Sequence, residues 1–401
     1  MTQNQAPPGP SFRPASGSFA GRPQVLLAGF ILLVFCTGTA EFLVAGLLPE
    51  VSADLDVSLP VAGQAATAYA LTVAFGGPLV TLATARLPRK GLVLGLCGVF
   101  VFGTLLSALA PGFAVLLVGR VLAASAQATL FAIALVVATS VVSPDRAGRA
   151  VAAVTSGLTV ATVLGVPLGQ WVGGATHWRV PFLAAAAAAV LGTLLVAVSM
   201  PRAATAPAEG ALAELSVLRR TPVLLSLATT AVGCAGVGVV FTYLVPLLTD
   251  VSGFTGGAVT ALLVAYGVGG FTGNVVAGRL ADRSVGATLR GVFTAMVAVM
   301  ALLPFAAPVP WAAVLAVGAL GVLSTATIAP LQTLLLRHAS GAPTLSVAVN
   351  VGAFNLANAL GASLGGLGVG VGLLRWNGLL GAVFAGVGLL LAGAVLRRTR
   401  S

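Results

Sequence analysis

Charged residues are scarce in this sequence. Only 7% of its 401 residues are Asp, Glu, Lys or Arg and 58% are hydrophobic, whereas about a quarter of the residues of soluble domains are charged. Apolar runs of about 20 residues, enough for a helix to cross a bilayer, recur from end to end. Backbone polar groups in a bilayer core must be satisfied within their own segment. The sequence therefore predicts an all-α integral membrane protein.

Cysteine and histidine are also rare, with three and two residues. Cys36, Cys97 and Cys234 fall inside predicted spans and are interpreted as small apolar residues rather than as a disulfide or metal framework. No phosphate-binding Gly-x-x-x-x-Gly-Lys-Ser/Thr loop is present, so ATP-driven transport is not expected. An integral membrane transferase, the least favoured alternative, would need clustered acids, histidines or lysines at one membrane face. We expect no metal, no cofactor and no enzymatic activity.

Twelve transmembrane helices in two pseudo-symmetric six-helix bundles are predicted. The expected division is a disordered cytoplasmic tail (1–23), an N-terminal bundle (24–200), a cytoplasmic linker (201–222), a C-terminal bundle (223–396) and a basic tail (397–401). The twelve spans are placed near 24–48, 62–84, 91–110, 113–142, 150–174, 180–200, 223–247, 257–280, 288–306, 310–336, 345–372 and 378–396.

The positive charges orient this arrangement. With a cytoplasmic N-terminus, 17 of the 20 Lys and Arg residues fall on the cytoplasmic side, as positive-inside loops require. The net charge of +11 is thus interpreted as topology and attraction to anionic lipid, not as nucleic-acid binding. We expect a bacterial cytoplasmic membrane protein with both termini inside, working as a monomer. The acids Glu50, Asp54, Asp56 and Asp250 are assigned to outer aqueous loops.

A repeated motif supports duplication of a six-span unit. A Gly-Gly pair, eight residues and a basic loop occur at 76–90 and again at 269–283, both at the cytoplasmic end of a half's second span. Parallel duplication is a known transporter architecture, with the substrate site between the halves. The residues expected to form cytoplasmic gate loops are Arg86, Arg89, Lys90, Arg279, Asp282 and Arg283.

Glu41 is an acid inside an apolar run, where a charged side chain costs about 2.5–3.5 kcal/mol on insertion scales. Glu41 and Arg120 each lie about seven residues from the outer end of their spans, or roughly 10 Å deep at a rise of about 1.5 Å per residue. Two opposite charges at one depth are cheaper together than apart. One interpretation is a proton-coupling pair in which Glu41 takes up a proton. The alternative is a structural pair that fixes helix 1 against helix 4.

Polar side chains inside other spans are candidates for a substrate cavity. They could instead form hydrogen bonds that hold neighbouring helices together. Those on the eleventh span fall within a roughly 140° arc of one helix face. The candidates are Gln64, Thr67, Tyr69, Gln127, Tyr243, Asn274, Asn350, Phe354, Asn355 and Asn358.

Small residues recur every four positions in the fifth span, at Gly157, Ala161, Gly165, Gly169 and Gly173, and similar stripes occur in spans 2, 8 and 11. Such stripes allow close helix packing. The alternative is that the stripes only reflect how common Ala and Gly are throughout the sequence. Pro167 removes a backbone hydrogen bond and favours a local bend.

Several motifs together resemble a known family. Gly278 to Arg283 is similar to the cytoplasmic-loop signature of the major facilitator superfamily, although Pro88 replaces the acid expected in the first-half copy. Leu117 to Arg120 resembles the arginine motif of proton-coupled members, and Gly157 to Gly169 the fifth-span motif of exporters. With Gly38 to Phe42 and Phe354 to Gly361, these residues resemble the bacterial chloramphenicol-efflux branch of twelve-span drug:proton antiporters.

The resemblance implies export of small amphiphilic, chloramphenicol-like drugs from the cytoplasm by proton antiport and alternating access. It covers nearly all of 24–396, it marks Arg120 as the motif arginine, and it implies that spans 2, 5, 8 and 11, with their small-residue stripes, line the interface between the halves. The same branch includes exporters of sugars and nucleosides, so proton-coupled export of a metabolite, including an amino acid, remains an alternative.

Overall fold

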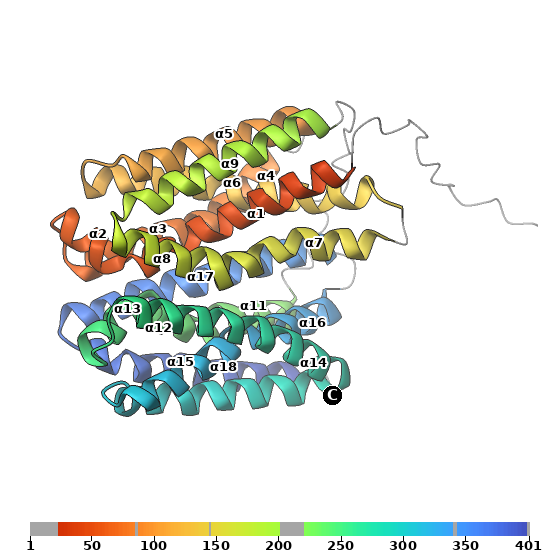
Figure 1. Ribbon diagram of the computed structural model, residues 1–401. Helices are drawn as coiled ribbons and strands as arrows, with labels where there is room; N and C mark the ends of the chain where they lie inside the picture. Colours follow the sequence, from red (N-terminus) through yellow and green to blue (C-terminus); the bar gives the residue numbers. More distant parts are fainter. Residues whose placement is uncertain (1–22, 85–86, 144–145, 201–219, 340–342, 399–401) are drawn as a thin grey trace, which may run out of the picture.

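The computed structural model describes residues 23–84, 87–143, 146–200, 220–339 and 343–398. Every regular element within these ranges is helical. Most of the predicted tails, most of the predicted linker and Arg86 lie outside the described residues. Figure 1 shows two groups of roughly parallel helices, one above the other.

The first bundle is built from the elements between Pro23 and Ser199. They are α1 (Pro23–Gly46), α2 (Leu48–Asp54), α3 (Leu59–Leu71), η1 (Thr72–Gly76), α4 (Gly77–Thr84), α5 (Arg89–Ala108), α6 (Phe113–Ser140), α7 (Ala147–Val160), η3 (Ala161–Gly165), α8 (Val166–Ala175) and α9 (Arg179–Ser199).

The second bundle follows the linker and packs around a separate apolar core. Its elements are α11 (Thr221–Gly233), α12 (Ala235–Thr242), α13 (Leu244–Pro246), η4 (Leu247–Val251), α14 (Gly256–Ala306), α15 (Pro310–Ala326), α16 (Ile328–His338), α17 (Pro343–Gly370), η5 (Leu374–Trp376) and α18 (Asn377–Arg398).

The described helices account for the twelve predicted spans. Nine segments are long and apolar enough to cross a membrane, and Leu59–Thr81, which meets the short helix α2 at a bend of 116°, adds a tenth. The 51 residues of α14 break at Ser284, whose backbone is extended (φ −160°, ψ 100°), and Figure 1 shows α14 turning back there. Its two limbs therefore count as two spans, and α17, with 28 residues, is the twelfth. We call the end of the bundles that carries α2 the outer end, after the predicted orientation.

Prolines shape the second and fifth spans in the same way. The π-helical turn η1 ends two residues before Pro78, and the π-helical turn η3 ends two residues before Pro167. Proline cannot donate to the carbonyl four residues earlier, and a wider turn adjusts the chain to this loss. The local distortion predicted at Pro167 is therefore a π-helical turn just before the proline.

The small residues of the fifth span face a different neighbour from the one predicted. A Cβ at Gly157 would meet the backbone of α1, and Cβ atoms at Gly165 and Gly169 would meet Thr39 and Leu43 of α1. This stripe therefore packs within the first bundle, so the expectation that it forms the interface between the halves is wrong. Helices inside a bilayer gain little from the hydrophobic effect when they associate. Close contacts at glycines strengthen the van der Waals packing between α1 and the fifth span instead.

The eighth and eleventh spans repeat this use of glycine inside the second bundle. Gly273 of α14 lies against Val322 of α15, and Gly361 of α17 lies against Ala235 and Val239 of α12. Contacts between the bundles come from other positions of the same helices. Gly267 of α14, for example, is in close contact with Thr162.

Candidate functional site

Arg120 is buried in the middle of the first bundle, with only 1% of its surface exposed. Its Nη1 atom donates to the carbonyl of Ala40, its Nη2 atom to the carbonyl of Glu41 at 2.8 Å, and its Nε atom to the carbonyl of Ala65 at 3.3 Å. One side chain of α6 therefore binds the backbones of both α1 and α3. The forked guanidinium can do this because its donors point in several fixed directions.

Tyr69 covers the other face of Arg120 and continues the network. The guanidinium carbon lies 4.0 Å from the centre of the Tyr69 ring, a cation–π distance. The Tyr69 hydroxyl donates to Oε1 of Gln127, and Nε2 of Gln127 donates to Oε2 of Glu41 at 2.6 Å. Gln127 thus uses one amide to join the phenol of α3 to the carboxylate of α1.

This network changes how the two intramembrane charges are related. Arg120 binds the main-chain carbonyl of Glu41, while the Glu41 carboxylate accepts its hydrogen bond from Gln127. The two groups lie at one level, yet the link between carboxylate and guanidinium runs through Gln127 and Tyr69. Tyr69 is fully buried and Gln127 is 8% exposed, whereas Glu41 is only partly buried. The acid is therefore the member of the network nearest to the accessible surface.

Two further cavity candidates sit where the bundles meet. The Thr67 hydroxyl of α3 shares a hydrogen bond of 3.2 Å with Ser363 of α17. Tyr243 is buried beside Gly63 of the first bundle and donates to the carbonyl of Ala362 at 3.0 Å. Both contacts lie in the outer half of the spans, so these residues help to hold the bundles together there.

The remaining candidates are not gathered into one cavity. Asn350 accepts from Thr230 at 2.9 Å and donates to Gln332 at 2.8 Å, a network inside the second bundle. Asn355 donates to the carbonyl of Val351, and its Oδ1 atom is buried without a partner. Phe354 packs on the core of the second bundle, Asn358 and Gln64 are partly buried and Asn274 is exposed.

The predicted gate residues lie at the end of the molecule opposite α2. Lys90 donates to the carbonyl of Met200 at 2.6 Å and so ties the start of α5 to the end of α9. Arg279, Asp282 and Arg283 are exposed beside the turn at Ser284 in α14, and Arg89 is partly buried.

Glu50 does not lie in an aqueous loop, and the prediction that placed it there is wrong. It belongs to α2, which folds back between the first two spans, and its Oε2 atom is buried without a hydrogen-bond partner. Its other carboxylate oxygen faces Gly174 of α8. Burial raises the pKa of the Glu50 carboxyl, against a smaller lowering by its own backbone N–H.

Asp54, one turn further along α2, has many partners. It accepts from the indole of Trp178 at 3.0 Å and from the guanidinium of Arg179, and His177 lies 3.3 Å away. These contacts, led by the Trp178 hydrogen bond, hold the pKa of Asp54 below its usual range. Arg179 also donates to the carbonyl of Ala110 at 2.8 Å. Through these contacts Asp54 and Arg179 hold together α2, the start of α9 and the loop after α5 at the outer end of the first bundle.

Several residues of the junction between bundles escaped sequence reasoning. Gln170 of α8, 7% exposed, accepts from Thr260 of α14, and Phe42 of α1 meets Phe241 of α12 edge to face with ring centres 5.7 Å apart. Gln170 could have been found, because a glutamine inside an apolar run usually needs a partner. Phe241 gives no such signal in a sequence so rich in apolar residues.

Comparison with known proteins gives the family. A family model described as Major Facilitator Superfamily matches residues 30–366. The chain belongs to the major facilitator superfamily. It is therefore a transporter and not an enzyme, and it is a multi-pass protein of the bacterial inner membrane. The predicted fold class is confirmed.

Relatives within the superfamily are close in length to this chain. It is 39% identical over 322 residues to the inner membrane transport protein YdhP of Escherichia coli. The matched region covers 80% of this chain and 83% of that protein. It is 36% identical over 340 residues to a chloramphenicol resistance protein of Streptomyces lividans, which covers 82% and 86%.

The solved structures share the fold at low sequence identity. The bacterial homologue of the human lysosomal transporter Spinster, in an inward-facing and unoccupied conformation, matches with a TM-score of 0.71 and 16% identity over 94% of this chain and 97% of that chain. The nucleoside transporter NupG matches with a TM-score of 0.72 and 12% identity over 94% and 99%.

Proposed function

We propose that this transporter exports small, neutral, amphiphilic drugs of the chloramphenicol type from the cytoplasm in exchange for protons. The observation that carries the proposal is the partly buried carboxylate of Glu41 inside α1, whose hydrogen bond to Gln127 connects it to Tyr69 and Arg120. A carboxylate within a membrane span is costly while it is ionised and marks ion or proton pathways. Glu41 is the proton-binding residue of this proposal.

The network offers a physical route from proton binding to movement. An ionised Glu41 accepts from Gln127, and protonation weakens that hydrogen bond because charge-assisted bonds are about twice as strong as neutral ones. The same Gln127 amide holds Tyr69 of α3, so a change at the carboxylate reaches helices α1, α3 and α6 together. Arg120 stays fixed to the backbone of α1 and α3 and keeps the three helices in register.

The resemblance to a chloramphenicol resistance protein at 36% identity supports the drug class. The bacterial membrane, with both termini in the cytoplasm and one chain as the working unit, completes the proposal. Transport of a metabolite is the second candidate. It is favoured by 27% identity over 328 residues to a probable sugar efflux transporter of Helicobacter pylori.

Everted vesicles that contain the full chain test the proposal. An imposed pH gradient, acid inside, should drive uptake of radiolabelled chloramphenicol, and Glu41→Gln should abolish this uptake while substrate binding remains. The matched control is Asp250→Asn, which neutralises an exposed acid at the outer end of the second bundle. Gradient-driven uptake at the parental rate in Glu41→Gln would exclude Glu41 as the coupling residue. A panel of sugars and nucleosides in the same vesicles distinguishes the metabolite alternative.

A further inference from the structure

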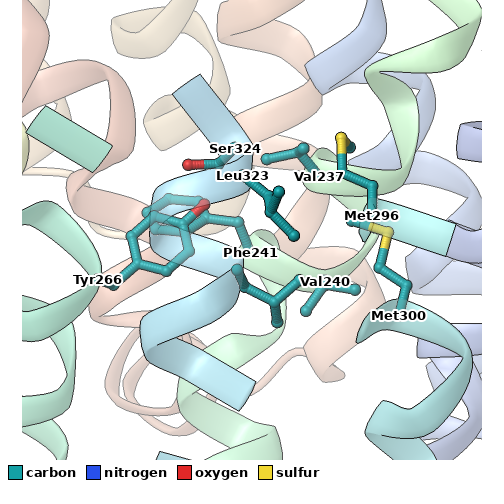
Figure 2. Close-up of a pocket in the computed structure, with 9 residues that line it drawn as sticks. Val237, Val240, Phe241, Tyr266, Met296, Met300, Leu323 and Ser324 are labelled. Carbon is teal, nitrogen blue, oxygen red and sulfur yellow. The ribbon is translucent and has the colours of Figure 1, made fainter. Parts of the chain in front are cut away.

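The two bundles are held together along the outer halves of their spans. Thr67 of α3 is hydrogen-bonded to Ser363 of α17, α8 packs against α14, and α13 packs against α2. Phe241 of α12, which meets Phe42 of α1, also lies against Tyr266 of α14 with ring centres 5.0 Å apart (Figure 2). The outer end of the transporter is therefore closed in this structure.

Glu50 lies at this closed end, on the short helix α2. Leu48 and Val51 of α2 are fully buried, with 0% of their surfaces exposed, and the helix contacts α1 and α3 of its own bundle and α13 of the other. This packing fixes Glu50 at the junction, where its Oε2 atom is buried without a hydrogen-bond partner. A buried carboxylate that lacks partners is costly while it is ionised, so the closed end favours the protonated form of Glu50.

The other carboxylate oxygen of Glu50 lies near Gln170 of α8. Oε1 of Glu50 and Nε2 of Gln170 are 3.5 and 3.8 Å from the position that a Cβ atom would take at Gly174. The Gln170 side chain is 7% exposed, and its oxygen accepts a hydrogen bond from Thr260 of α14. One buried glutamine thus adjoins the Glu50 carboxyl group and binds the second bundle.

The charged groups around Glu50 leave burial as the main influence on its ionisation. Helices α3, α8 and α13 carry no charged residue, and Arg179 and His177 both contact Asp54. Burial raises the pKa of the Glu50 carboxyl. The titratable groups of the surrounding elements are Glu41 on α1, Asp54 and Asp56 in and after α2, His177 and Arg179 at the start of α9, and Tyr243 beside α13.

Opening of the outer end would change this environment. A transporter with its substrate site between two bundles opens at each end in turn, and opening here separates α13 from α2 and α14 from α8. Water then reaches the carboxyl group of Glu50, and a hydrated glutamate ionises at its ordinary pKa of about 4.3.

We propose that Glu50 is a second proton-binding residue of this transporter, which holds a proton while the outer end is closed and releases it as that end opens. The inference adds an outer proton site to the proposed function, and it depends neither on the substrate nor on Glu41 as the coupling residue. Because the closed form binds this proton more tightly, low pH stabilises closure. The stabilisation is lost as the pH rises through the raised pKa of Glu50.

The test measures the separation of the bundles at the outer end, with the full chain in lipid nanodiscs. Spin labels on Thr176→Cys and Val371→Cys, at exposed positions after α8 and α17, report the distance by double electron–electron resonance. The native cysteines are buried, and the chain without introduced cysteines measures their background. The short-distance population should fall between about pH 5 and about pH 8. For each unit by which the Glu50 pKa differs between the two forms, the ratio of closed to open protein changes by up to about tenfold.

Two variants remove the proton site. Glu50→Gln imitates the protonated carboxyl group and should keep the short-distance population constant over this pH range, and Glu50→Ala should also abolish the pH dependence if the glutamine variant fails to fold. The matched control is Asp56→Asn, which removes an exposed charge from the loop after α2. Asparagine tolerates the left-handed backbone of this position, with φ 50°. The control should keep the pH dependence of the parent protein.

Each distance measurement is repeated with Glu41→Gln, so that protonation of Glu41 does not contribute. A parent protein whose distances do not change with pH would overturn the proposal. A pH dependence that survives the loss of the Glu50 carboxyl group in the Glu41→Gln background would also overturn it.

Proton binding has its own readout. The protonated-carboxyl band in infrared spectra of the parent protein minus Glu50→Gln gives the pH at which Glu50 loses its proton. Loss of the band above about pH 4.3 is expected, and loss at that ordinary value would overturn the site. A pH-dependent distance without gradient-driven chloramphenicol uptake would refute the proposed function and leave the Glu50 site standing. Uptake without a pH-dependent distance would do the reverse.

Discussion

The side-chain amide of Gln127 binds the Glu41 carboxylate through its nitrogen, at 2.6 Å, and the Tyr69 hydroxyl through its oxygen. Both hydrogen-bonding ends of one glutamine are thus used between two different helices, α1 and α3. Among the described residues, Gln127 is the side chain that donates a hydrogen bond to the Glu41 carboxylate. The behaviour of Glu41 should therefore depend on Gln127 more than on any other neutral side chain.

Replacing Gln127 with Met keeps its length and removes both hydrogen bonds. A hydrogen bond to a charged group contributes about 1.5–3 kcal/mol, so proton-driven export should fall about tenfold or more. The rate of gradient-driven uptake in everted vesicles checks this. Gln24→Met, near the start of α1, is the matched control, since Gln24 is exposed and outside the network. An equal fall in both variants would show that Gln127 has no specific role.

Replacing Arg120 with Lys keeps the charge but cannot reproduce the arrangement. An ammonium is compact and cannot reach the carbonyls of α1 and α3 together while stacking on Tyr69. A buried charge that loses its partners typically costs about 3–5 kcal/mol. We expect a clearly lower thermal midpoint for Arg120→Lys in detergent. Arg290→Lys, at an exposed position of α14, should change stability by less than about 0.5 kcal/mol. Equal midpoints for the two variants would contradict this account of Arg120.

The sequence predicted how deep a residue lies in the membrane better than which neighbour its side chain faces. Counting residues from span ends places Glu41 and Arg120 at one level, and the structure has the guanidinium on the main chain of Glu41 itself. Counting cannot say how each helix is rotated, because apolar residues surround these helices and leave no polar face to orient them. Gln127 therefore could not be predicted as the partner of the carboxylate.

The same limit explains the two errors. Glycines at every fourth position indicate close packing but not the neighbour, so Gly165 was expected between the bundles and lies instead on Thr39 of α1. Glu50 follows an apolar run and precedes acids, which is typical of an aqueous loop, yet the bend of 116° between α2 and the second span turns it inward. The twelve spans were predictable because hydrophobic length alone determines them.

Gly165 should not tolerate a side chain. A Cβ there would lie 3.1 Å from the Cβ and Cγ2 atoms of Thr39 and closer still to its hydroxyl, so Gly165→Ala should destabilise the protein by about 1–3 kcal/mol. Gly95→Ala, on α5, meets no atom within 4 Å and should be neutral or stabilising by up to about 1 kcal/mol. Thermal melting of both variants measures the difference.

Thr39→Ala provides the second half of this test. The Thr39 hydroxyl is buried without a hydrogen-bond partner, so its removal leaves no group unsatisfied and should cost little. In the double variant with Gly165→Ala, most of the lost stability should return, because neighbouring substitutions are not additive. Strictly additive effects would mean that Gly165 is constrained by another contact.

Glu50→Gln should make stability less dependent on pH. The pKa of Glu50 is raised by burial, so the folded protein binds this proton more tightly than the unfolded chain. The stability contributed in this way is complete below the ordinary glutamate pKa of about 4.3 and is lost as pH rises through the raised pKa. Glutamine resembles the protonated form, so the variant should melt above the parent protein at about pH 8, and the difference should narrow as the pH falls to about 5.

Asp54 acts in the opposite direction and sets the range of the experiment. Its pKa is lowered by Trp178 and Arg179, so its contribution is present above the ordinary aspartate pKa of about 3.9 and is lost on stronger acidification. Measurements above that value leave the Asp54 contribution constant. A Glu50→Gln variant whose thermal midpoint runs parallel to that of the parent protein from about pH 5 to about pH 8 would show that the buried carboxylate oxygen of Glu50 carries no energetic penalty.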